Sequence, residues 1–188
     1  MGRWEPNARG RLEKAALELY AERGFDATTV AEIAARAGLT ERTFFRHFAD
    51  KREVLFGGAD ALEDRLVRGT AQAPADLGPV EAIAAALVDL ADEAFAERHR
   101  LAQQRQAIIA AHPELREREL IKLASLASAL AGALRQRGVP DPAASLAAEA
   151  GVAVFKVSFE RWITGSRSLP LSDIIRQSLA DLKAITAS

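Results

Sequence analysis

Apolar residues recur at spacings of three and four along most of the chain, which is the period of an amphipathic helix. Nowhere do turn residues flank the alternation of apolar and polar positions that indicates a strand. The first helix is predicted over residues 7–23. Its apolar positions are Leu12, Ala15, Ala16, Leu19 and Tyr20. The fold class expected from this pattern is all-α.

Glycine, proline and capping residues divide the pattern into segments. Thr29 and Glu32 form a predicted capping box at the start of a second helix, and Thr40 is the natural N-cap of a third. Asp50 with Glu53 is expected to start a fourth helix. Nine helices are predicted, over about residues 7–23, 29–37, 41–48, 50 to beyond 67, 79–97, 99–111, 113–137, 141–164 and 170–186.

The second and third helices are very short and are joined by a tight turn at Gly38. Helices of this length are not stable alone, so they must pack on the longer first helix. Ala34 permits a close approach of the two helices, while Phe44 and Phe48 lie four apart and anchor the third helix inward. This arrangement predicts a helix-turn-helix DNA reader. The alternative is an ordinary three-helix packing without a role in DNA binding.

Composition and charge limit how such a protein could bind DNA. Apolar residues make up 49% of the chain and charged residues 27%, which is enough for a buried core and argues against disorder. The absence of cysteine excludes disulfides, cysteine-based zinc sites and thiol nucleophiles. The net charge is −1, with a balance of +2 over residues 1–52 and −3 over residues 53–188. DNA binding would therefore depend on a few well-placed cations instead of a basic surface.

Several short runs around the predicted turn share one register. They are Gly24-Phe25, Thr28-Thr29-Val30, Ile33-Ala34, Ala37-Gly38-Leu39-Thr40, Thr43-Phe44-Phe45 and His47-Phe48, followed by Lys51 and Leu55. Over about residues 9–56 they resemble the TetR family of bacterial repressors. The resemblance implies a DNA-binding domain over residues 7–67, with the helix-turn-helix at about 28–47, and an effector-binding and dimerisation domain over residues 68–188. It also implies a ligand-responsive homodimeric repressor without a cofactor, released from a palindromic operator by a small apolar or amphipathic effector.

Candidate DNA contacts lie on the third helix and at the starts of its neighbours. They are Thr28, Thr29, Thr40, Arg42, Thr43, Phe45, Arg46, His47 and Lys51. Arg42 can grip guanine through two donors, and the methyl group of Thr43 can meet a thymine methyl group. Lys51 and His47 are candidate phosphate donors, with plain solvation or helix capping as their alternatives. The resembled family has tyrosine at position 45, so Phe45 is expected to stack or to contact a methyl group.

The remaining segments provide candidates for an effector pocket and a dimer interface. An apolar pocket with a small polar end is predicted from Leu66, Leu87, Leu90, Phe95, Gln104, Arg105, Ile108, His112 and Leu123. A dimer interface is predicted from two apolar stripes, with internal core as the alternative. These residues are Phe155, Phe159, Trp162, Ile163, Ile174, Ile175, Leu179 and Leu182.

Residues 109–116 resemble actinobacterial family members, some of which respond to acyl-CoA-like or other lipid-related ligands. The fourth helix, with Lys51 at its DNA end and Leu62 and Leu66 deep in the larger domain, is expected to link effector and DNA as a rigid lever. We expect structural or surface roles for His99 and His112, because no cysteine or second histidine stands at a metal-ligand spacing from them.

Other classes of function are weighed against this prediction. No catalytic triad, phosphate loop or paired carboxylates stand out, so no catalytic residue and no metal ligand is expected. A helical enzyme, or a sensor that has lost DNA binding, is the alternative from another class, and activation in place of repression stays open. No apolar segment follows Met1, and no run of 18 apolar residues lacks charge, so neither a signal peptide nor a membrane span is expected. The expected location is the bacterial cytoplasm, and the nucleoid when DNA is bound.

Overall fold

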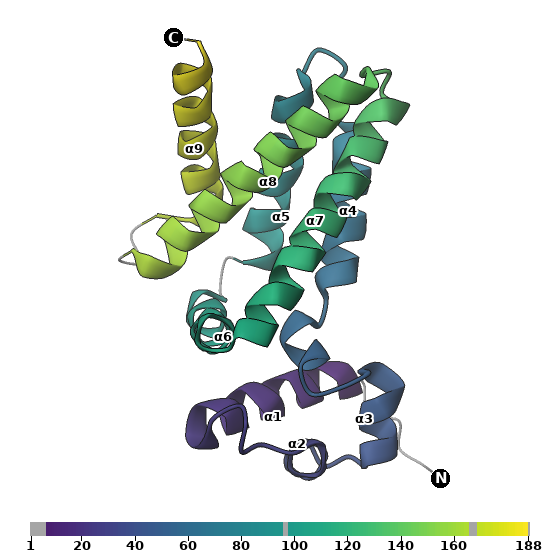
Figure 1. The fold of residues 1–188 in the computed structure, drawn as a ribbon, viewed down its shortest axis with the longest axis vertical. Helices are drawn as coiled ribbons and strands as arrows, with labels where there is room; N and C mark the ends of the chain where they lie inside the picture. The colour runs from purple at the N-terminus through teal and green to yellow at the C-terminus, as the bar shows by residue number, and fades with distance from the viewer. Residues whose placement is uncertain (1–6, 96–97, 166–168, 188) are drawn as a thin grey trace. The chain divides into compact units, whose positions relative to one another are not determined.

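The computed structural model describes residues 7–95, 98–165 and 169–187, and all regular secondary structure within them is helical. Within these residues there are nine α-helices, as many as predicted, and one 3-10 helix, η1 (Figure 1). The elements are α1 (Ala8–Arg23), α2 (Val30–Arg36), α3 (Glu41–His47), η1 (Glu53–Phe56), α4 (Ala59–Gln72), α5 (Pro79–Ala94), α6 (His99–Ala111), α7 (Pro113–Gln136), α8 (Asp141–Thr164) and α9 (Leu171–Thr186). The all-α prediction is confirmed.

The helices pack into two compact units. Unit 1 contains residues up to 59 together with 104–116, and unit 2 contains residues 60–103 and 117–188. The chain therefore passes between the units at the start of α4, within α6 and again within α7. The predicted domain boundary at residue 67 stays a prediction.

Unit 1 is built around α1, whose buried face packs against α2, α3 and η1. Its core includes the predicted positions Leu12, Leu19 and Phe44, which are at most 2% exposed. Ile109 and Leu115, from the junction of α6 and α7, are fully buried in the same core. The junction therefore belongs structurally to the helix-turn-helix unit, although it lies more than 50 residues further along the chain.

The prediction of one continuous fourth helix is wrong. Asp50 accepts a hydrogen bond from the backbone of Glu53 at 2.9 Å, but the helix that begins there is η1, which ends at Phe56. Gly57 and Gly58 separate it from α4, and Gly58 has a φ of 83°, which a helix cannot contain. Lys51 therefore lies in a turn before η1, whereas Leu66 lies on α4, and the rigid lever does not exist in this form.

Unit 2 has its core where α5, α8 and α9 pack against one another. Leu66 of α4 and Leu130 of α7 complete this core and are at most 3% exposed. By length and composition α8 could cross a membrane, but 39% of its most apolar stretch is buried inside the structure. A core helix meets the same criterion, and the buried side of α8 packs on α5 and α9.

Candidate nucleic-acid interface

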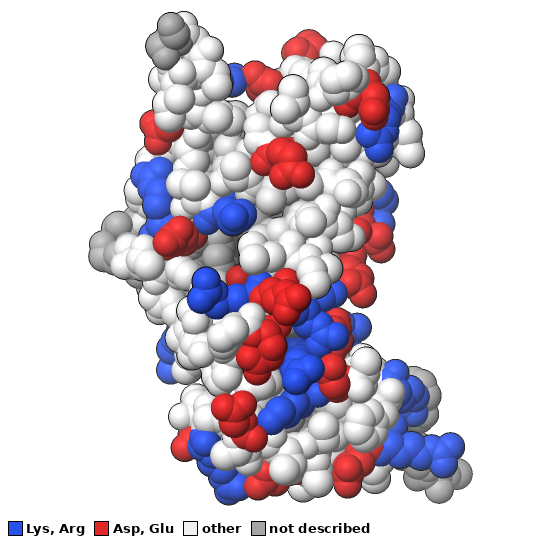
Figure 2. All heavy atoms as spheres, in the orientation of Figure 1, with Lys and Arg blue, Asp and Glu red and all other residues white. Residues whose placement is uncertain are grey.

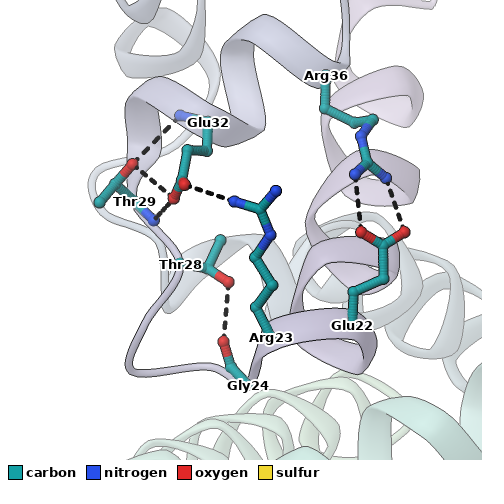
Figure 3. Close-up of polar contacts among 7 residues, drawn as sticks. All are labelled: Glu22, Arg23, Gly24, Thr28, Thr29, Glu32 and Arg36. Carbon is teal, nitrogen blue, oxygen red and sulfur yellow. Dashed lines mark hydrogen bonds and ion pairs between the residues drawn. The ribbon is translucent and has the colours of Figure 1, made fainter.

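Helix α2 is held at its start by the predicted capping box (Figure 3). The Thr29 hydroxyl accepts a hydrogen bond from the backbone N–H of Glu32 at 3.3 Å, and the Glu32 carboxylate accepts one from the backbone N–H of Thr29 at 2.9 Å. Arg23 of α1 also donates to Glu32 at 2.8 Å. The hydrogen bonds from Thr29, more than the charge of Arg23, lower the pKa of Glu32 below its ordinary value.

A second ion pair fixes α2 against α1. Arg36 donates to both carboxylate oxygens of Glu22, at 3.0 and 2.8 Å, as Figure 3 shows. The pairing lowers the pKa of Glu22, chiefly through the hydrogen bond from Arg36. Both Arg23 and Arg36 are thus bonded to carboxylates within the motif, and their charges are neutralised locally.

The turn that follows α2 aims the third helix. Gly38 has a φ of 65°, as its predicted role requires. Beneath the turn, Arg11 of α1 donates to the backbone carbonyl of Ala37. The sequence does not predict this contact, because Arg11 has the pattern of an ordinary polar residue of the first helix. It ties the turn to α1 and thereby fixes the start of α3.

Helix α3 presents an outward face with two arginines and an aromatic ring. Arg42, Phe45 and Arg46 are all exposed, and with Thr43 they line a concavity of about 650 Å³. Thr40 caps the helix, accepting from the backbone N–H of Thr43 at 3.2 Å, and the two threonine hydroxyls are 3.1 Å apart. The predicted cap at Thr40 is confirmed, and its hydroxyl is occupied within the motif.

The two arginines of α3 differ from those of α1 and α2 in their bonding. Within the described residues, neither Arg42 nor Arg46 has a hydrogen-bond or ion-pair partner. On the face of the molecule drawn in Figure 2, acidic and basic side chains are interspersed and form no continuous basic surface. Within this motif, the positive charge that is available to an anionic partner is therefore confined to α3.

Lys51 and Thr28 are also predicted to contact DNA, but their hydrogen bonds within the protein argue against this role. Lys51 donates to the backbone carbonyls of Phe25, Asp26 and Thr28 at 2.8–3.1 Å, and its ammonium lies 4.6 Å from the centre of the Phe25 ring. An ammonium has three protons, so none is left for a phosphate. Thr28 is 1% exposed, and its hydroxyl donates to the carbonyl of Gly24 at 2.8 Å. These side chains close the loop between α1 and α2.

One ring nitrogen of His47 is not accessible to a phosphate. Its Nε2 atom is buried and has no hydrogen-bond partner among the described residues. An atom so placed cannot reach a phosphate from α3 without rearrangement. Thr29 is exposed, but its hydroxyl is taken up by the capping box.

The residues predicted for an effector pocket are divided between the two units. Leu66, Leu87, Leu90, Phe95 and Leu123 lie in or against the core of unit 2. Gln104, Arg105, Ile108 and His112 belong to unit 1. There Arg105 donates to the carbonyl of Leu55, and His112 contacts the Phe25 ring edge-on, with centroids 5.0 Å apart. A hollow of about 350 Å³ between α5 and α9 is lined by other residues, among them Glu81, Val88 and Leu179.

The residues predicted for the dimer interface also divide into two groups. Trp162, Ile174 and Ile175 are at most 7% exposed within the single chain, so they form its internal core, which was the alternative for these stripes. The others are half-buried: Phe155, Phe159, Ile163, Leu179 and Leu182. His99 is buried at Trp162 with its Nε2 atom 2.8 Å from the carbonyl oxygen, so its predicted structural role is confirmed.

Sequence reasoning missed a buried hydroxyl that has no hydrogen-bond partner within the described structure. Thr70 of α4 is 0% exposed, and its hydroxyl has no hydrogen-bond partner among the described residues. It lies four residues after Leu66, on the same face of the helix. Only its position one turn beyond a core leucine could have drawn attention to it in the sequence.

Curated proteins resemble part of this chain. The HTH-type transcriptional regulator TcmR of Streptomyces glaucescens is 37% identical over 78 residues, which are 42% of this chain and 34% of TcmR. The matched segments span about a third of the curated relatives, 34% of the first and 30% of the second.

Two solved structures show the same fold. FadR of Thermus thermophilus, a TetR-family repressor in complex with lauroyl-CoA, has 24% sequence identity and a TM-score of 0.55, covering 92% of this chain and 91% of FadR. SmeT, the repressor of the Stenotrophomonas maltophilia multidrug efflux pump SmeDEF, has 21% identity and a TM-score of 0.60, covering 91% of this chain and 86% of SmeT.

Two families match the chain directly. Residues 12–56 match the family described as bacterial regulatory proteins, tetR family, and residues 77–187 match the MftR C-terminal domain. The first match contains the helix-turn-helix, and the second covers more than half of the chain. The chain therefore belongs to the TetR family of DNA-binding transcription regulators and carries a C-terminal domain of the MftR type.

Proposed function

We propose that this regulator is a homodimeric repressor that leaves a palindromic operator when a small apolar or amphipathic molecule binds unit 2. Its site of action is the bacterial cytoplasm, where the DNA lies. The proposed DNA binding is supported mainly by which arginines have hydrogen-bond or ion-pair partners in the described part of the chain and which have none. Arg42 and Arg46 project from α3 without partners among the described residues, whereas Arg23 and Arg36 are paired with carboxylates.

The lack of partners for Arg42 and Arg46 within the described residues matters because an arginine that is bonded to a carboxylate would have to break that bond before it could bind a base or a phosphate. A free guanidinium on a helix that enters the major groove can form two hydrogen bonds with guanine. Both arginines line the same concavity, together with Thr43 and Phe45. A two-fold dimer presents two such helices, and half-sites are then expected one helical turn, about 34–36 Å, apart or at a multiple of that distance.

A gel-shift experiment with the DNA upstream of the protein's own gene tests the proposed DNA binding by Arg42 and Arg46. The wild-type chain should retard that DNA, and the double variant Arg42→Ala, Arg46→Ala should not. The matched control is the double variant Arg23→Ala, Arg36→Ala, which removes the same charge from paired positions and should bind once it is folded. Equal binding by all three proteins would contradict the proposal.

The effector is proposed to enter the core of unit 2 beside α4. The predicted pocket residues there, such as Leu66, Leu87 and Leu90, are apolar and buried, so the ligand would be largely apolar. The Thr70 hydroxyl lies on the same face of α4 as Leu66 and has no partner in the described structure. A buried hydroxyl without a partner costs about 1–3 kcal/mol, and a ligand with one polar atom would recover that free energy.

Lauroyl-CoA, the ligand of the Thermus FadR structure, is a suitable first probe because it joins an acyl chain to a polar group. Calorimetry should measure its affinity with and without operator DNA. A ligand that releases DNA must bind more weakly to the DNA-bound protein, by the same factor with which it weakens DNA binding. Equal affinity in both cases would exclude lauroyl-CoA as the releasing effector. Thr70→Val should weaken its binding without affecting DNA binding.

A further inference from the structure

An aromatic ring stands exposed on the helix proposed to read DNA. Phe45 is 56% exposed at the middle of α3, between Arg42 one turn before it and Arg46 directly after it. The ring carries no hydrogen-bond donor or acceptor, so it cannot hold a phosphate or a polar base edge. Leaving such a ring in water forgoes the favourable burial that a partner surface would provide. A partner with an apolar group at this place would recover that burial.

The ring is also held in position before any partner arrives. Phe44 is fully buried in the core of unit 1, and its ring meets that of Phe45 edge-on, with centroids 5.4 Å apart and an angle of 82° between the planes. The core thus anchors Phe44, and Phe44 supports Phe45. A supported ring loses little side-chain entropy on binding, so a contact with a single small group becomes worthwhile.

The major groove offers one exposed apolar group, the 5-methyl group of thymine. Phe45 lines the concavity of about 650 Å³ together with Arg42, Thr43 and Arg46. We propose that Phe45 reads the 5-methyl group of a pyrimidine in each half-site, and that thymine supplies it. This inference rests on the proposed DNA-binding function and names one element of its sequence specificity.

The test begins with an operator selected from a random DNA library by the full-length wild-type protein. Each thymine of a half-site is then replaced singly by deoxyuridine, which removes only the methyl group. One position should stand out, with affinity falling about four-fold per half-site, the effect expected for one buried methyl group. With Phe45→Ala the thymine and deoxyuridine operators should bind equally well.

Three further variants show whether the preference for thymine depends on the Phe45 ring itself. Thr43→Ser removes the methyl group of a second candidate DNA contact, so its overall affinity for DNA can fall, but the four-fold ratio between thymine and deoxyuridine at the position read by Phe45 should remain. Leu120→Ala, which shortens a leucine of α7 that is 58% exposed, should keep it as well. Phe45→Leu, which remains apolar, should retain part of the preference. Because Phe45 is exposed, its variants should unfold at the same temperature as the wild type.

A further pair of operators tests whether the methyl group comes from thymine or from 5-methylcytosine. Cytosine and 5-methylcytosine, each paired with guanine, are placed at the sensitive position. Methylation should restore less affinity than thymine does, because the base pair itself differs; full restoration would assign recognition to methylated cytosine and overturn the assignment to thymine. A preference for thymine that persists in Phe45→Ala, or no sensitive position at all, would overturn the inference while the DNA-binding function stands. A library that yields no enriched sequence would overturn both.

Discussion

At the scale of single residues, hydrogen bonds within the protein distinguish the side chains that stabilise the helix-turn-helix from those available to DNA. Thr28, Lys51 and Arg36 all have side chains that could hydrogen-bond to DNA, yet each is bonded to carbonyls or carboxylates of its own unit. Arg42, Phe45 and Arg46 have no such bonds within the described residues and lie on one face of α3. Partners, more than exposure, therefore select the candidates for DNA contact.

Arg42→Ala should weaken operator binding and relax the preference at one base pair of each half-site. A bidentate contact between arginine and guanine contributes roughly 1–3 kcal/mol of discrimination. Fluorescence anisotropy with the operator and with single-base variants measures both effects. Arg23→Ala is the control, because that arginine is paired with Glu32 and should leave the base preference unchanged. If Arg42→Ala bound as tightly and as selectively as the wild type, Arg42 would not read a base.

Lys51→Ala should lower the stability of the protein and leave the salt dependence of DNA binding unchanged. The ammonium satisfies three backbone carbonyls, and its loss should cost about 2 kcal/mol of unfolding free energy. A phosphate contact would instead contribute about one to the slope of log affinity against log salt. Urea denaturation and a salt titration separate the two roles. A slope reduced by about one would restore Lys51 as a phosphate contact.

Much at this scale could be predicted from the sequence, because helical spacing alone places Arg42, Phe45 and Arg46 together. The contacts of Lys51 could not be predicted. Its three acceptors are carbonyls of a loop more than 20 residues earlier, and every residue has a carbonyl, so no side-chain pattern marks them. The contact of Arg11 beneath the turn could not be predicted for the same reason.

At the scale of elements, local capping sets the helix boundaries. The capping box between Thr29 and Glu32 is predictable from two residues three apart, and it forms as expected because all its partners lie within one turn. The prediction of the fourth helix is wrong for a different reason. The predicted capping residues start a helix, but the two consecutive glycines at 57 and 58 interrupt it. Helix starts are thus better determined by sequence than helix continuity.

Glu32→Gln should make the protein less stable near neutral pH and change little in acid. The pKa of Glu32 is lowered in the folded protein, so its contribution is present above its ordinary value of 4.5 and is lost as the pH falls through the lowered value. Thermal unfolding of both proteins across this range shows whether the gap closes. A gap independent of pH would mean that the carboxylate charge does not matter.

The same contact can be tested from its other side. Thr29→Ala should destabilise the protein by about 1 kcal/mol, as for other lost helix caps. Adding Glu32→Gln to Thr29→Ala should have a smaller effect than Glu32→Gln alone, because the two side chains bond to each other. Strictly additive effects would show that the capping box is not a unit.

At the scale of the whole molecule, sequence patterns do not separate the proposed dimer interface from the internal core. Apolar residues spaced three and four apart mark a buried face, but the pattern is the same whether the face packs within one chain or against a second copy. Trp162 and Ile175 face the interior of their own chain. The exposed apolar residues of α8 are others, Leu146 at 73% and Val157 at 51%, with exposed Ala153 between them on the same face.

Val157→Glu should therefore convert the proposed dimer to monomer without unfolding it. It would bury an unpaired charge in the interface, which is very unfavourable. Leu120→Glu, at a comparably exposed leucine of α7, is the matched control and should remain dimeric. Light scattering reports the mass, and circular dichroism reports the fold. A dimeric Val157→Glu protein would place the interface on another surface.

Whether the unpartnered arginines of α3 read DNA is decided by selecting DNA from a random library with the wild-type chain and then measuring binding of the selected site to Arg42→Ala, Arg46→Ala. We predict an enriched near-palindrome with two half-sites, one bound dimer per site, and loss of sequence preference in the double variant. Failure to enrich any sequence, or undiminished selectivity in the double variant, would show that these arginines do not read DNA.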